Sequence, residues 1–350
     1  MKTRTHVAIR RVIAVLGLVV PFVGCTPKTE MDPYRPHGTW ERLADMPTGR
    51  YALCAAAIDG KLYAVGGERR ALWYFEQSAL ERYDPATDTW ERLADMPTRR
   101  YDMAAAVIDG KLYVVGGKNN TTELGTLERY DPATDTWERL ANMPTPRHGL
   151  AAAAISGMLY AVGGYYDRNH SGALERYNPE TDAWQSLPRM PTPRANLGAG
   201  VIEDQLLVAG GDGGNHVLEY FDPVSYAWGQ LLQLPLPRAS FAAAVLDGRL
   251  YVVGGESTKN LLERYDPQSD LWHLLPDMPT GRTKPAAVAL DGHLYVVGGC
   301  SWFSSKKALE RYTPGRGDED LRQRPLEHPP LIFEESPDPF ENPPREPDQY

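Results

Sequence analysis

Six arginines and six glutamates are the residues of this chain whose types and regular spacing most clearly allow chemistry. Each arginine stands 16 residues before a pair of glycines, at Arg50, Arg100, Arg147, Arg194, Arg238 and Arg282. Each has a matching glutamate further along its repeat, at Glu81, Glu128, Glu175, Glu219, Glu263 and Glu310. Such a set predicts either a basic funnel for an anionic ligand or structural ion pairs. Because an asymmetric ligand cannot use six equivalent positions alike, we favour ion pairs or hydrogen bonds to the backbone.

The positions just after these arginines differ from repeat to repeat. One residue after the arginine stand Tyr51, Tyr101, His148, Ala195, Ala239 and Thr283. One residue further stand Ala52, Asp102, Gly149, Asn196, Ser240 and Lys284. Residues that vary within a repeated frame indicate a binding surface. We therefore expect ligand contacts in this region.

Aromatic residues also gather in the loops that follow the paired glycines. These loops contain Trp73, Tyr74, Phe75, Tyr165, Tyr166, Trp302 and Phe303. Exposed aromatics on one surface are typical of recognition sites, although several of them could simply pack against neighbouring loops. The predicted ligand-binding residues are Tyr51, Tyr101, Asp102, His148, Asn196, Lys284, Tyr165, Tyr166 and Trp302.

Histidines and cysteines give no metal motif. No spacing among the eight histidines resembles a zinc or copper site, and only His148, His170 and His216 stand where they could approach one another. No nucleophile elbow, phosphate loop or pair of catalytic carboxylates appears. The motifs therefore predict no metal, no cofactor and no catalytic residue. Cys54 and Cys300 fall in the first and last repeats, so a disulfide between them is one expectation and free buried thiols are the alternative.

The element that must position these residues is a short hydrophobic run ending in two glycines. It occurs six times, at residues 62–67, 112–117, 159–164, 206–211, 250–255 and 294–299. A tryptophan stands 26 residues before each glycine pair, at Trp40, Trp90, Trp137, Trp184, Trp228 and Trp272. A period of 44 to 50 residues is typical of a propeller or solenoid.

One repeat has the pattern of four strands. In the second repeat we expect strands at residues 100–108, 112–115, 127–130 and 137–140, with a two-residue turn at Asp109-Gly110 between the first two. The innermost strand is rich in Ala and Val, which suit the crowded centre of a propeller. All length variation falls between the glycine pair and the third strand, so one rim should carry the variable loops.

The hydrophobic run before paired glycines, followed by a tyrosine and a tryptophan seven residues later, resembles the kelch repeat family of β-propellers. The resemblance covers Trp40 to Tyr312 and implies six blades of four antiparallel strands, in residues 39–312. Residue 319, seven after Tyr312, is Glu rather than Trp, and Trp40 has no strands before it. We therefore expect the N-terminal strand around Trp40 to complete the sixth blade and close the ring.

The family resemblance also bears on function. It implies that the variable residues after the arginines face the mouth in kelch proteins that bind peptides. Some kelch propellers are enzymes: copper-radical galactose oxidases need a Tyr and His copper set that we cannot place here. Periplasmic sialic acid mutarotases need only acid and base groups in the channel, for which Asp102, His148 and Arg194 are the candidates.

The two ends of the chain differ in composition from the repeats. Residues 1–24 have the basic start and apolar run of a signal peptide, and Gly24-Cys25 resembles the cleavage box of bacterial lipoproteins. We expect lipidation of Cys25, a tether over residues 25–38 and attachment to the bacterial cell envelope, at the outer membrane or the periplasmic face; plain secretion is the alternative. Residues 313–350 hold nine prolines, ten acids and four arginines, which predicts a disordered acidic tail.

Net charge helps to limit the partners. The chain carries a formal charge of -9, which argues against nucleic acid. We expect an exported, monomeric propeller that binds a protein or a glycan at the mouth with the variable loops. The alternative is a sugar mutarotase or epimerase in the channel mouth. Inward-pointing carboxylates with His148 would favour the enzyme, and a broad aromatic rim would favour the binding module.

Overall fold

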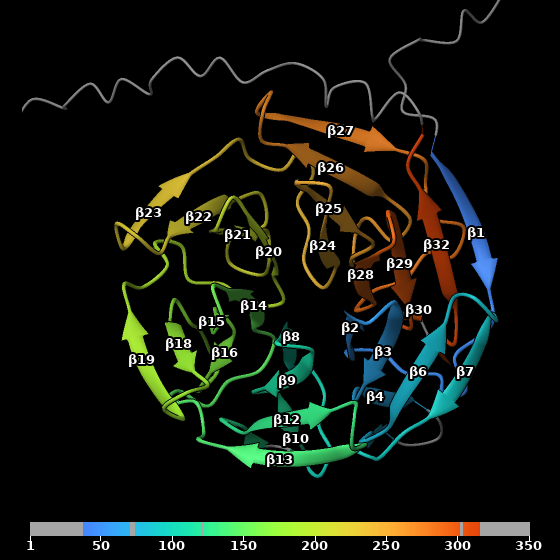
Figure 1. Cartoon of the computed structure of the whole chain (residues 1–350). Helices are drawn as coiled ribbons and strands as arrows, with labels where there is room; N and C mark the ends of the chain where they lie inside the picture. The colour runs from blue at the N-terminus through green and yellow to red at the C-terminus, as the bar shows by residue number, and fades with distance from the viewer. Residues whose placement is uncertain (1–37, 71–73, 121, 302–303, 316–350) are drawn as a thin grey trace, which may run out of the picture. The chain divides into compact units, whose positions relative to one another are not determined.

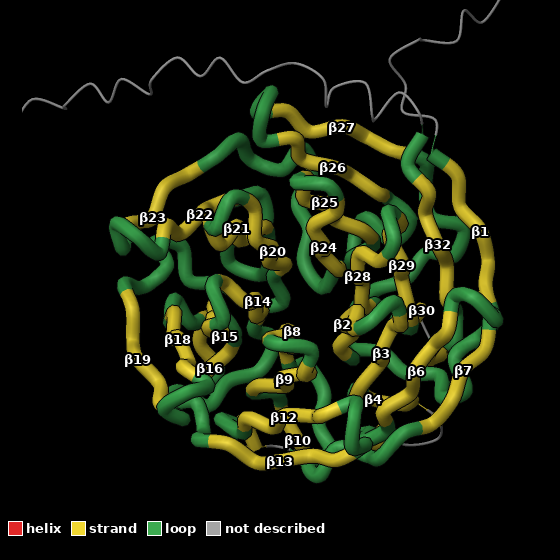
Figure 2. The backbone as a smooth tube through the Cα atoms, in the orientation of Figure 1, coloured by secondary structure: helices red, strands yellow, loops and turns green. Residues whose placement is uncertain are grey.

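Six four-stranded sheets stand around a central axis like the blades of a wheel (Figure 1). The structure is a computed structural model that describes residues 38–70, 74–120, 122–301 and 304–315. These residues belong to one compact unit, and they form strands and loops without a helix (Figure 2). The predicted all-β, six-bladed propeller is confirmed.

Each blade consists of four antiparallel strands, with the first strand next to the axis. Blades one and two contain β2 (Cys54–Ile58), β3 (Lys61–Val65), β6 (Leu80–Asp84), β7 (Thr89–Arg92), β8 (Ala104–Ile108), β9 (Lys111–Val115), β12 (Leu127–Asp131) and β13 (Thr136–Leu140). Blades three and four contain β14 (Ala151–Ile155), β15 (Met158–Val162), β18 (Leu174–Asn178), β19 (Ala183–Leu187), β20 (Gly198–Ile202), β21 (Gln205–Ala209), β22 (Leu218–Asp222) and β23 (Ala227–Gln230). Blades five and six contain β24 (Ala242–Leu246), β25 (Arg249–Val253), β26 (Leu262–Asp266), β27 (Leu271–Leu275), β28 (Ala286–Leu290), β29 (His293–Val297), β32 (Leu309–Thr313) and β1 (Thr39–Leu43).

The N-terminal strand closes the ring as the sequence predicts. β1 pairs with β32 in an antiparallel register that runs from Thr39 opposite Thr313 to Leu43 opposite Leu309. The rings of Trp40 and Tyr312 lie 5.3 Å apart. Figure 1 shows β1 beside β32 at the edge of blade six. The two ends of the repeat region are therefore locked into one sheet, which gives the blade at the junction its full four strands.

The turns place the two rims of the wheel. Asp109 and Gly110 both have positive φ angles, 48° and 70°, as a two-residue turn between antiparallel strands requires. These turns lie on one rim, which we call the turn rim, and the loops after the glycine pairs lie on the opposite rim, which we call the mouth rim. The first residue of β1, Thr39, pairs with the last residue of β32, Thr313, and both lie on the turn rim. The described chain therefore begins and ends on the turn rim.

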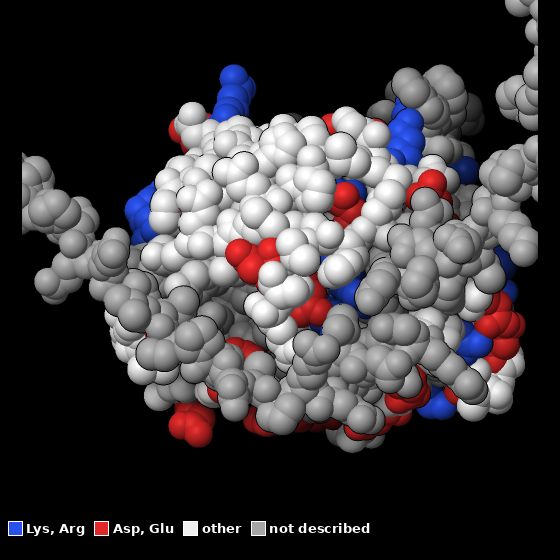
Figure 3. All heavy atoms as spheres, turned by 90° about the horizontal axis from the view of Figure 1, so that it is seen from above, with Lys and Arg blue, Asp and Glu red and all other residues white. Residues whose placement is uncertain are grey.

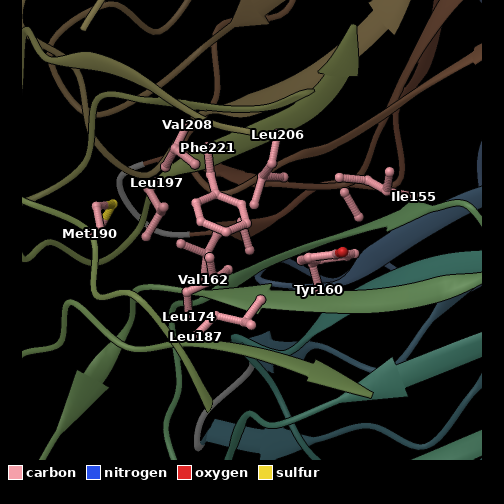
Figure 4. Close-up of a cluster of buried hydrophobic side chains, with 12 residues drawn as sticks. Ile155, Tyr160, Val162, Leu174, Leu187, Met190, Leu197, Leu206, Val208 and Phe221 are labelled. Carbon is pink, nitrogen blue, oxygen red and sulfur yellow. The ribbon is translucent and has the colours of Figure 1, made fainter. Parts of the chain in front are cut away.

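The core consists of hydrophobic layers between neighbouring blades. Figure 4 shows one such layer, in which Phe221 and Leu206 of blade four lie with Val162 and Tyr160 of blade three. In every blade the tryptophan ring lies 5.2 to 5.4 Å from the paired tyrosine or phenylalanine ring. Each indole N–H also donates to a backbone carbonyl of the preceding blade, for example Trp137 to Ala94 at 2.8 Å. The repeated aromatics therefore hold neighbouring blades together.

The paired glycines permit close approach between blades. Gly66 and Gly67 have φ angles of 61° and 96°, which side-chain-bearing residues rarely adopt. A Cβ on Gly66 would lie 3.0 Å from the carbonyl oxygen of Arg100 in the next blade, and one on Gly67 would lie 2.7 Å from the carbonyl oxygen of Tyr51. Any larger residue would push these segments apart.

The outer strands differ between the two sides of the wheel. Blades one, two and six expose Glu and Arg on the outer strand, such as Glu91 and Arg92. In blade five, Leu271 and Leu274 are 50% and 64% exposed. Figure 3 views the wheel from the side of β27 and shows few charged side chains among the described residues there. The described residues contain no helix that could cross a membrane. The predicted signal peptide, Cys25, the tether and most of the acidic tail lie outside the described residues.

Candidate functional site

The mouth rim carries four short hairpins and two short loops. The hairpins are β4 (Glu68–Arg70) with β5 (Tyr74–Glu76), β10 (Lys118–Asn119) with β11 (Thr122–Glu123), β16 (Tyr165–Tyr166) with β17 (Asn169–His170), and β30 (Cys300–Ser301) with β31 (Ser304–Ser305). They belong to blades one, two, three and six, whereas blades four and five have the six-residue loops 212–217 and 256–261. The mouth is therefore asymmetric: four blades carry a hairpin at the rim, and two blades carry only a short loop.

Hydrogen bonds from backbone amides to side-chain oxygens join the hairpins into a wall. The amide N–H of Arg70 donates to Ser305 Oγ at 2.8 Å, and that of Asn120 donates to Glu76 Oε1 at 2.8 Å. The amide N–H of Asp167 donates to Glu123 Oε2 at 3.0 Å. Each hairpin is thus linked to the next one, so the wall is continuous from blade six to blade three.

A closed ring of backbone hydrogen bonds lies inside the wall, where the first strand of each blade begins. We call its members the throat ring: Ala52, Asp102, Gly149, Asn196, Ser240 and Lys284. All six have positive φ angles between 49° and 61°. Each amide N–H donates to the carbonyl of the ring residue in the preceding blade at 2.7 to 3.0 Å, and Ala52 closes the ring by donating to Lys284 at 3.0 Å. The backbone is the same at all six positions, so only the side chains differ.

Polar contacts link the throat ring to itself and to the rim. Lys284 Nζ lies 2.8 Å and 2.7 Å from the two carboxylate oxygens of Asp102, across the intervening Ala52. Burial alone would lower the pKa of Lys284, but the Asp102 carboxylate outweighs it and raises that pKa. Asn196 Nδ2 donates to Asp212 Oδ2 at 2.6 Å, and Ser240 Oγ donates to Glu256 Oε1 at 3.0 Å.

A hollow of about 120 Å³ lies at the throat ring. The residues that follow the ring members form an apolar collar around it: Leu53, Met103, Leu150, Leu197, Phe241 and Pro285. A second hollow of about 430 Å³ lies over blade six and shares Lys284 with the first. Thr283, Ser301 and Glu256 give it polar walls, and Tyr51 lies on its blade-one side. A ligand at the mouth would therefore meet hydroxyl, carboxylate and ammonium groups together.

Aromatic residues occupy the paired positions next to the throat ring, after the arginines and after the glycine pairs. The Tyr51 hydroxyl donates to Glu68, whose pKa is raised by burial even though this hydrogen bond acts in the opposite direction. The Tyr165 hydroxyl lies 3.2 Å from Asp212 Oδ2 and 3.1 Å from His170 Nε2. Burial raises the pKa of Tyr101 and of Tyr165 to about 12, so both hydroxyls stay protonated and can donate.

His148 is held against Tyr165, with ring centroids 5.4 Å apart. Burial lowers the pKa of His148, which keeps the ring neutral near pH 7. Its Nδ1 lies 3.5 Å from Glu123 Oε1, which is too long for a good hydrogen bond. His216 Nδ1 instead lies 2.9 Å from the Leu234 carbonyl. Of the three histidines that could approach one another, His148 and His170 lie on either side of Tyr165.

The six arginines are buried and paired with their glutamates, as predicted. The nitrogen to oxygen distances are between 2.5 and 3.1 Å. Each guanidinium also donates to a carbonyl of the second strand, as Arg194 does to Val208 at 2.9 Å. Arg194 is fully buried, so this candidate for proton transfer does not face the mouth. Burial lowers the pKa of Arg100 to about 10, opposed by the Glu128 carboxylate.

The possible disulfide does not form: both cysteines are free, which was the alternative, although only Cys54 is buried. Cys54 points into the core between blades one and two, where its Sγ lies 2.9 Å from the Met103 carbonyl. Cys300 points to Thr283 of its own blade, with Sγ 3.1 Å from Thr283 Oγ1. Burial raises the pKa of Cys54 to about 12, so this thiol is inert. The repeat pattern predicts the blade in which each cysteine lies, but it does not predict the direction of either side chain.

The other predicted ligand residues are placed as follows. Tyr51, Tyr101 and His148 pair with the first residue of a rim hairpin, and Asp102, Asn196 and Lys284 belong to the throat ring. Tyr166 is 48% exposed on β16, outside the throat. Trp73, Trp302 and Phe303 lie outside the described residues.

Sequence reasoning missed the residues that directly follow the glycine pairs. These are Glu68, Lys118, Tyr165, Asp212, Glu256 and Cys300, of which only Tyr165 was predicted. They pair with the position after the arginine and contribute three carboxylates at the mouth, Glu68, Asp212 and Glu256. The signal was available, because this position also differs between almost all repeats. Among the described residues, no group of three or more His, Cys, Asp or Glu could hold a metal ion.

Comparisons with known proteins agree with this architecture. A family model described as the KLHDC2/KLHL20/DRC7 Kelch-repeats domain matches residues 37–211 and 144–299. A solved structure titled "Structure of YjhT" aligns with a TM-score of 0.65 at 17% sequence identity, over 75% of this chain and 95% of that chain. At this identity the likeness shows the fold alone. A search of curated proteins gave no significant match.

Proposed function

The chain belongs to the Kelch-repeat family, and from this premise we propose that it is a binding module of the bacterial cell envelope that holds a protein or glycan ligand at the mouth rim. The observation that carries the proposal is the throat ring. Six equivalent backbone positions hold six different residue types, each two positions after one of the six arginines that are all alike. A scaffold that repeats its frame and varies one ring is built for recognition of something without sixfold symmetry.

The shape of the mouth supports an asymmetric ligand. The hairpin wall runs around blades six, one, two and three, and the low loops of blades four and five leave that side open. An elongated ligand can enter over the low side and lie against Tyr51, Tyr101 and Tyr165. Tyrosine supplies both a flat apolar face and a hydroxyl, which suits sugar rings and peptide side chains alike.

The lipid anchor on Cys25 and a monomeric state remain part of this proposal. Support for anchoring comes from the leader pattern of residues 1–25 and from the place where the described chain begins, on the turn rim opposite the mouth. Metabolic labelling with a fatty acid analogue tests the anchor. Label on the wild type and none on Cys25→Ser is the expected result, and equal label on both contradicts it.

The binding function is tested with isolated envelope polysaccharide and with isolated envelope proteins as separate probes. We expect one of the two fractions to bind the protein with saturation. The variant Tyr101→Ala/Tyr165→Ala should lose at least about tenfold in affinity, since two central aromatic contacts are removed. Tyr226→Ala is the matched control, because Tyr226 is 42% exposed in the turn after β22 on the opposite rim. Equal binding by both variants would contradict the mouth as the site.

A second candidate function is a sugar mutarotase or epimerase, and one observation favours it. Glu68 lies nearly buried at the mouth with a raised pKa, next to the Tyr51 hydroxyl. A carboxyl with a raised pKa keeps its proton to a higher pH than a free carboxyl does, which makes it a better proton donor. Exchange between sugar anomers, followed by NMR, tests this function. Acceleration that Glu68→Gln abolishes supports an enzyme, and no acceleration across a panel of neutral and acidic sugars excludes it.

A further inference from the structure

A basic pocket lies beside the mouth, between the β4–β5 hairpin and the link into blade two. Its volume is about 450 Å³, and its walls include Arg69, Phe75, Arg92, Asp95 and Arg99. Arg69 and Phe75 stand directly opposite each other on the two strands of the hairpin. Phe75 is 50% exposed. The pocket therefore offers a cation and an aromatic ring side by side.

The acids of this pocket are already engaged. Arg92 holds Asp95 at 2.7 and 2.9 Å, and Ser78 donates to Asp95 as well. Glu76 accepts the amide N–H of Asn120. Arg69 and Arg99 are exposed, and neither forms an ion pair with any residue in the described part of the chain. Arg69 and Arg99 are thus left without an ionic partner among the described residues, and the three arginines of the lining exceed its two carboxylates, Glu76 and Asp95, by one charge.

One cation of this pocket, Arg99, has no basic counterpart in the other repeats. Arg99 directly precedes Arg100, one of the six buried, glutamate-paired arginines, which we call the framework arginines. At this position the other repeats have Gly49, Pro146, Pro193, Pro237 and Gly281. A neighbouring hollow on the other side of the hairpin is lined by Arg69, Arg70 and Lys307. In a chain with a formal charge of -9, such a concentration of cations marks a site for an acidic partner.

We propose that this pocket binds the chain's own acidic C-terminal segment, with Phe333-Glu334-Glu335 as its central element. The two glutamates match the two arginines, and Phe333 matches Phe75. Arginine holds carboxylates through charge-assisted hydrogen bonds, often in pairs. Residues 313–350 carry ten acids against four arginines, so charge complementarity favours this occupant. The inference goes beyond the proposed binding function, because it gives the rim an internal ligand.

Chain length allows the contact. Described structure ends at Gly315 in blade six, which is the neighbour of blade one, and Phe333 follows 18 residues later. That length spans up to about 60 Å when extended, at about 3.3 Å per residue. A segment tethered at this distance has an effective concentration of about a millimolar, so a weak intrinsic affinity is sufficient for occupancy.

The test uses the full chain with a photo-crosslinking benzoyl-phenylalanine in place of Phe333. After irradiation of dilute protein, mass spectrometry should place the crosslinks on the β4–β5 hairpin and the link around Arg99. The variant Arg69→Glu/Arg99→Glu should lower this yield about tenfold or more, because two attractive contacts become repulsive. Adding Glu334→Arg/Glu335→Arg to that variant should restore the crosslink.

The control is Arg168→Glu, which reverses an exposed arginine on the equivalent hairpin of blade three and should leave the yield unchanged. Four results would overturn the proposal: crosslinks elsewhere on the wheel, crosslinks between copies that vanish on dilution, no crosslink in any background, or a yield insensitive to the charge reversal. None of these outcomes bears on ligand binding at the throat ring, so failure here is distinguishable from failure of the proposed function.

Discussion

The framework arginines and the throat ring lie two residues apart in every repeat, yet they behave in opposite ways. At the arginine position the six repeats have the same residue, the same glutamate partner and nearly complete burial. At the ring position they have the same backbone and six different side chains. Positions with the same residue in all six repeats are therefore those that every blade needs for packing. Positions that differ between repeats are those that contact a ligand in our proposal.

The same contrast holds between whole layers. The Trp, Tyr and Gly repeats build the contacts between blades, and every one of them recurs around the wheel. The residues after the glycine pair and after the arginine have no such recurrence, and together they surround the mouth. Changes in the first group should unfold the protein, and changes in the second should alter binding while the fold persists.

The largest effect should come from removing the closing strand. Without residues 39–46, blade six has only three strands, and the layer that contains Trp40 loses its partner for Tyr312. We expect loss of the single cooperative unfolding transition, measured by circular dichroism and calorimetry. An unchanged transition would show that closure by β1 is dispensable.

Next in size should be the loss of one framework arginine. Arg147→Ala leaves the buried Glu175 without its cation and should lower the free energy of unfolding by about 3 to 5 kcal/mol. In contrast, Asp102→Ala/Lys284→Ala removes both members of the throat pair and should change stability by about 1 kcal/mol or less. Urea unfolding of the two variants compares the layers directly. Equal losses would erase the distinction between framework and ring.

A smaller effect should arise where the framework itself is incomplete. In five blades a threonine donates to the buried glutamate, as Thr192 does to Glu219 at 2.8 Å, but blade five has Leu236 at that position. Burial raises the pKa of Glu263 in blade five, against the opposing effect of Arg238. Leu236→Thr should stabilise the protein by about 1 kcal/mol at pH 7.

The sign of the pH dependence follows from the raised pKa. The folded state holds the proton of Glu263 more tightly than the unfolded chain does, so stability falls as pH rises from about 4.3 through the folded-state pKa. The added hydroxyl helps the ionised form, and its benefit should shrink at pH 4. Thr192→Leu is the matched control and should lose a similar amount at pH 7. A gain for Leu236→Thr that does not depend on pH would contradict this account.

The smallest effect belongs to the mouth. Burial lowers the pKa of His148, so the unfolded chain takes up a proton there more readily than the folded one. Stability should therefore decline as pH falls below about 6.5. His148→Gln should remove part of that decline, by a few tenths of a kcal/mol, in urea titrations at pH 7 and pH 5. If the wild type and the variant decline in parallel, His148 is not the titrating group.

Sequence was sufficient for the fold because its signals are local and repeated. Constant spacings among Trp, Arg and the glycine pairs predict the strands, the number of blades and the closure of blade six by the strand that contains Trp40. The pairing of the six arginines also followed from their number. The direction of single side chains did not: Cys54 and Cys300 stand in adjacent blades, but alternation along β2 turns Cys54 toward blade two.

The geometry of the mouth lay partly beyond sequence. Lys284 and Asp102 were both predicted to face a ligand, but their mutual contact depends on the small Ala52 between them. The position after the glycine pair also varies between repeats, like the two positions that follow each arginine, so the sequence contains the signal that predicts it. The hydrogen bonds that join the hairpins are donated by backbone amides, which residue types do not distinguish, so the sequence does not predict them.

The pairing of β1 with β32 has a mechanical consequence. If the molecule is held from its N-terminal side while a ligand pulls at the mouth, tension acts along the axis of β1, toward the turn rim. All five registered residue pairs between Thr39 and Leu43 then bear the load in shear, together rather than one after another. The strand that completes the wheel is thus also the attachment best arranged to resist being pulled out.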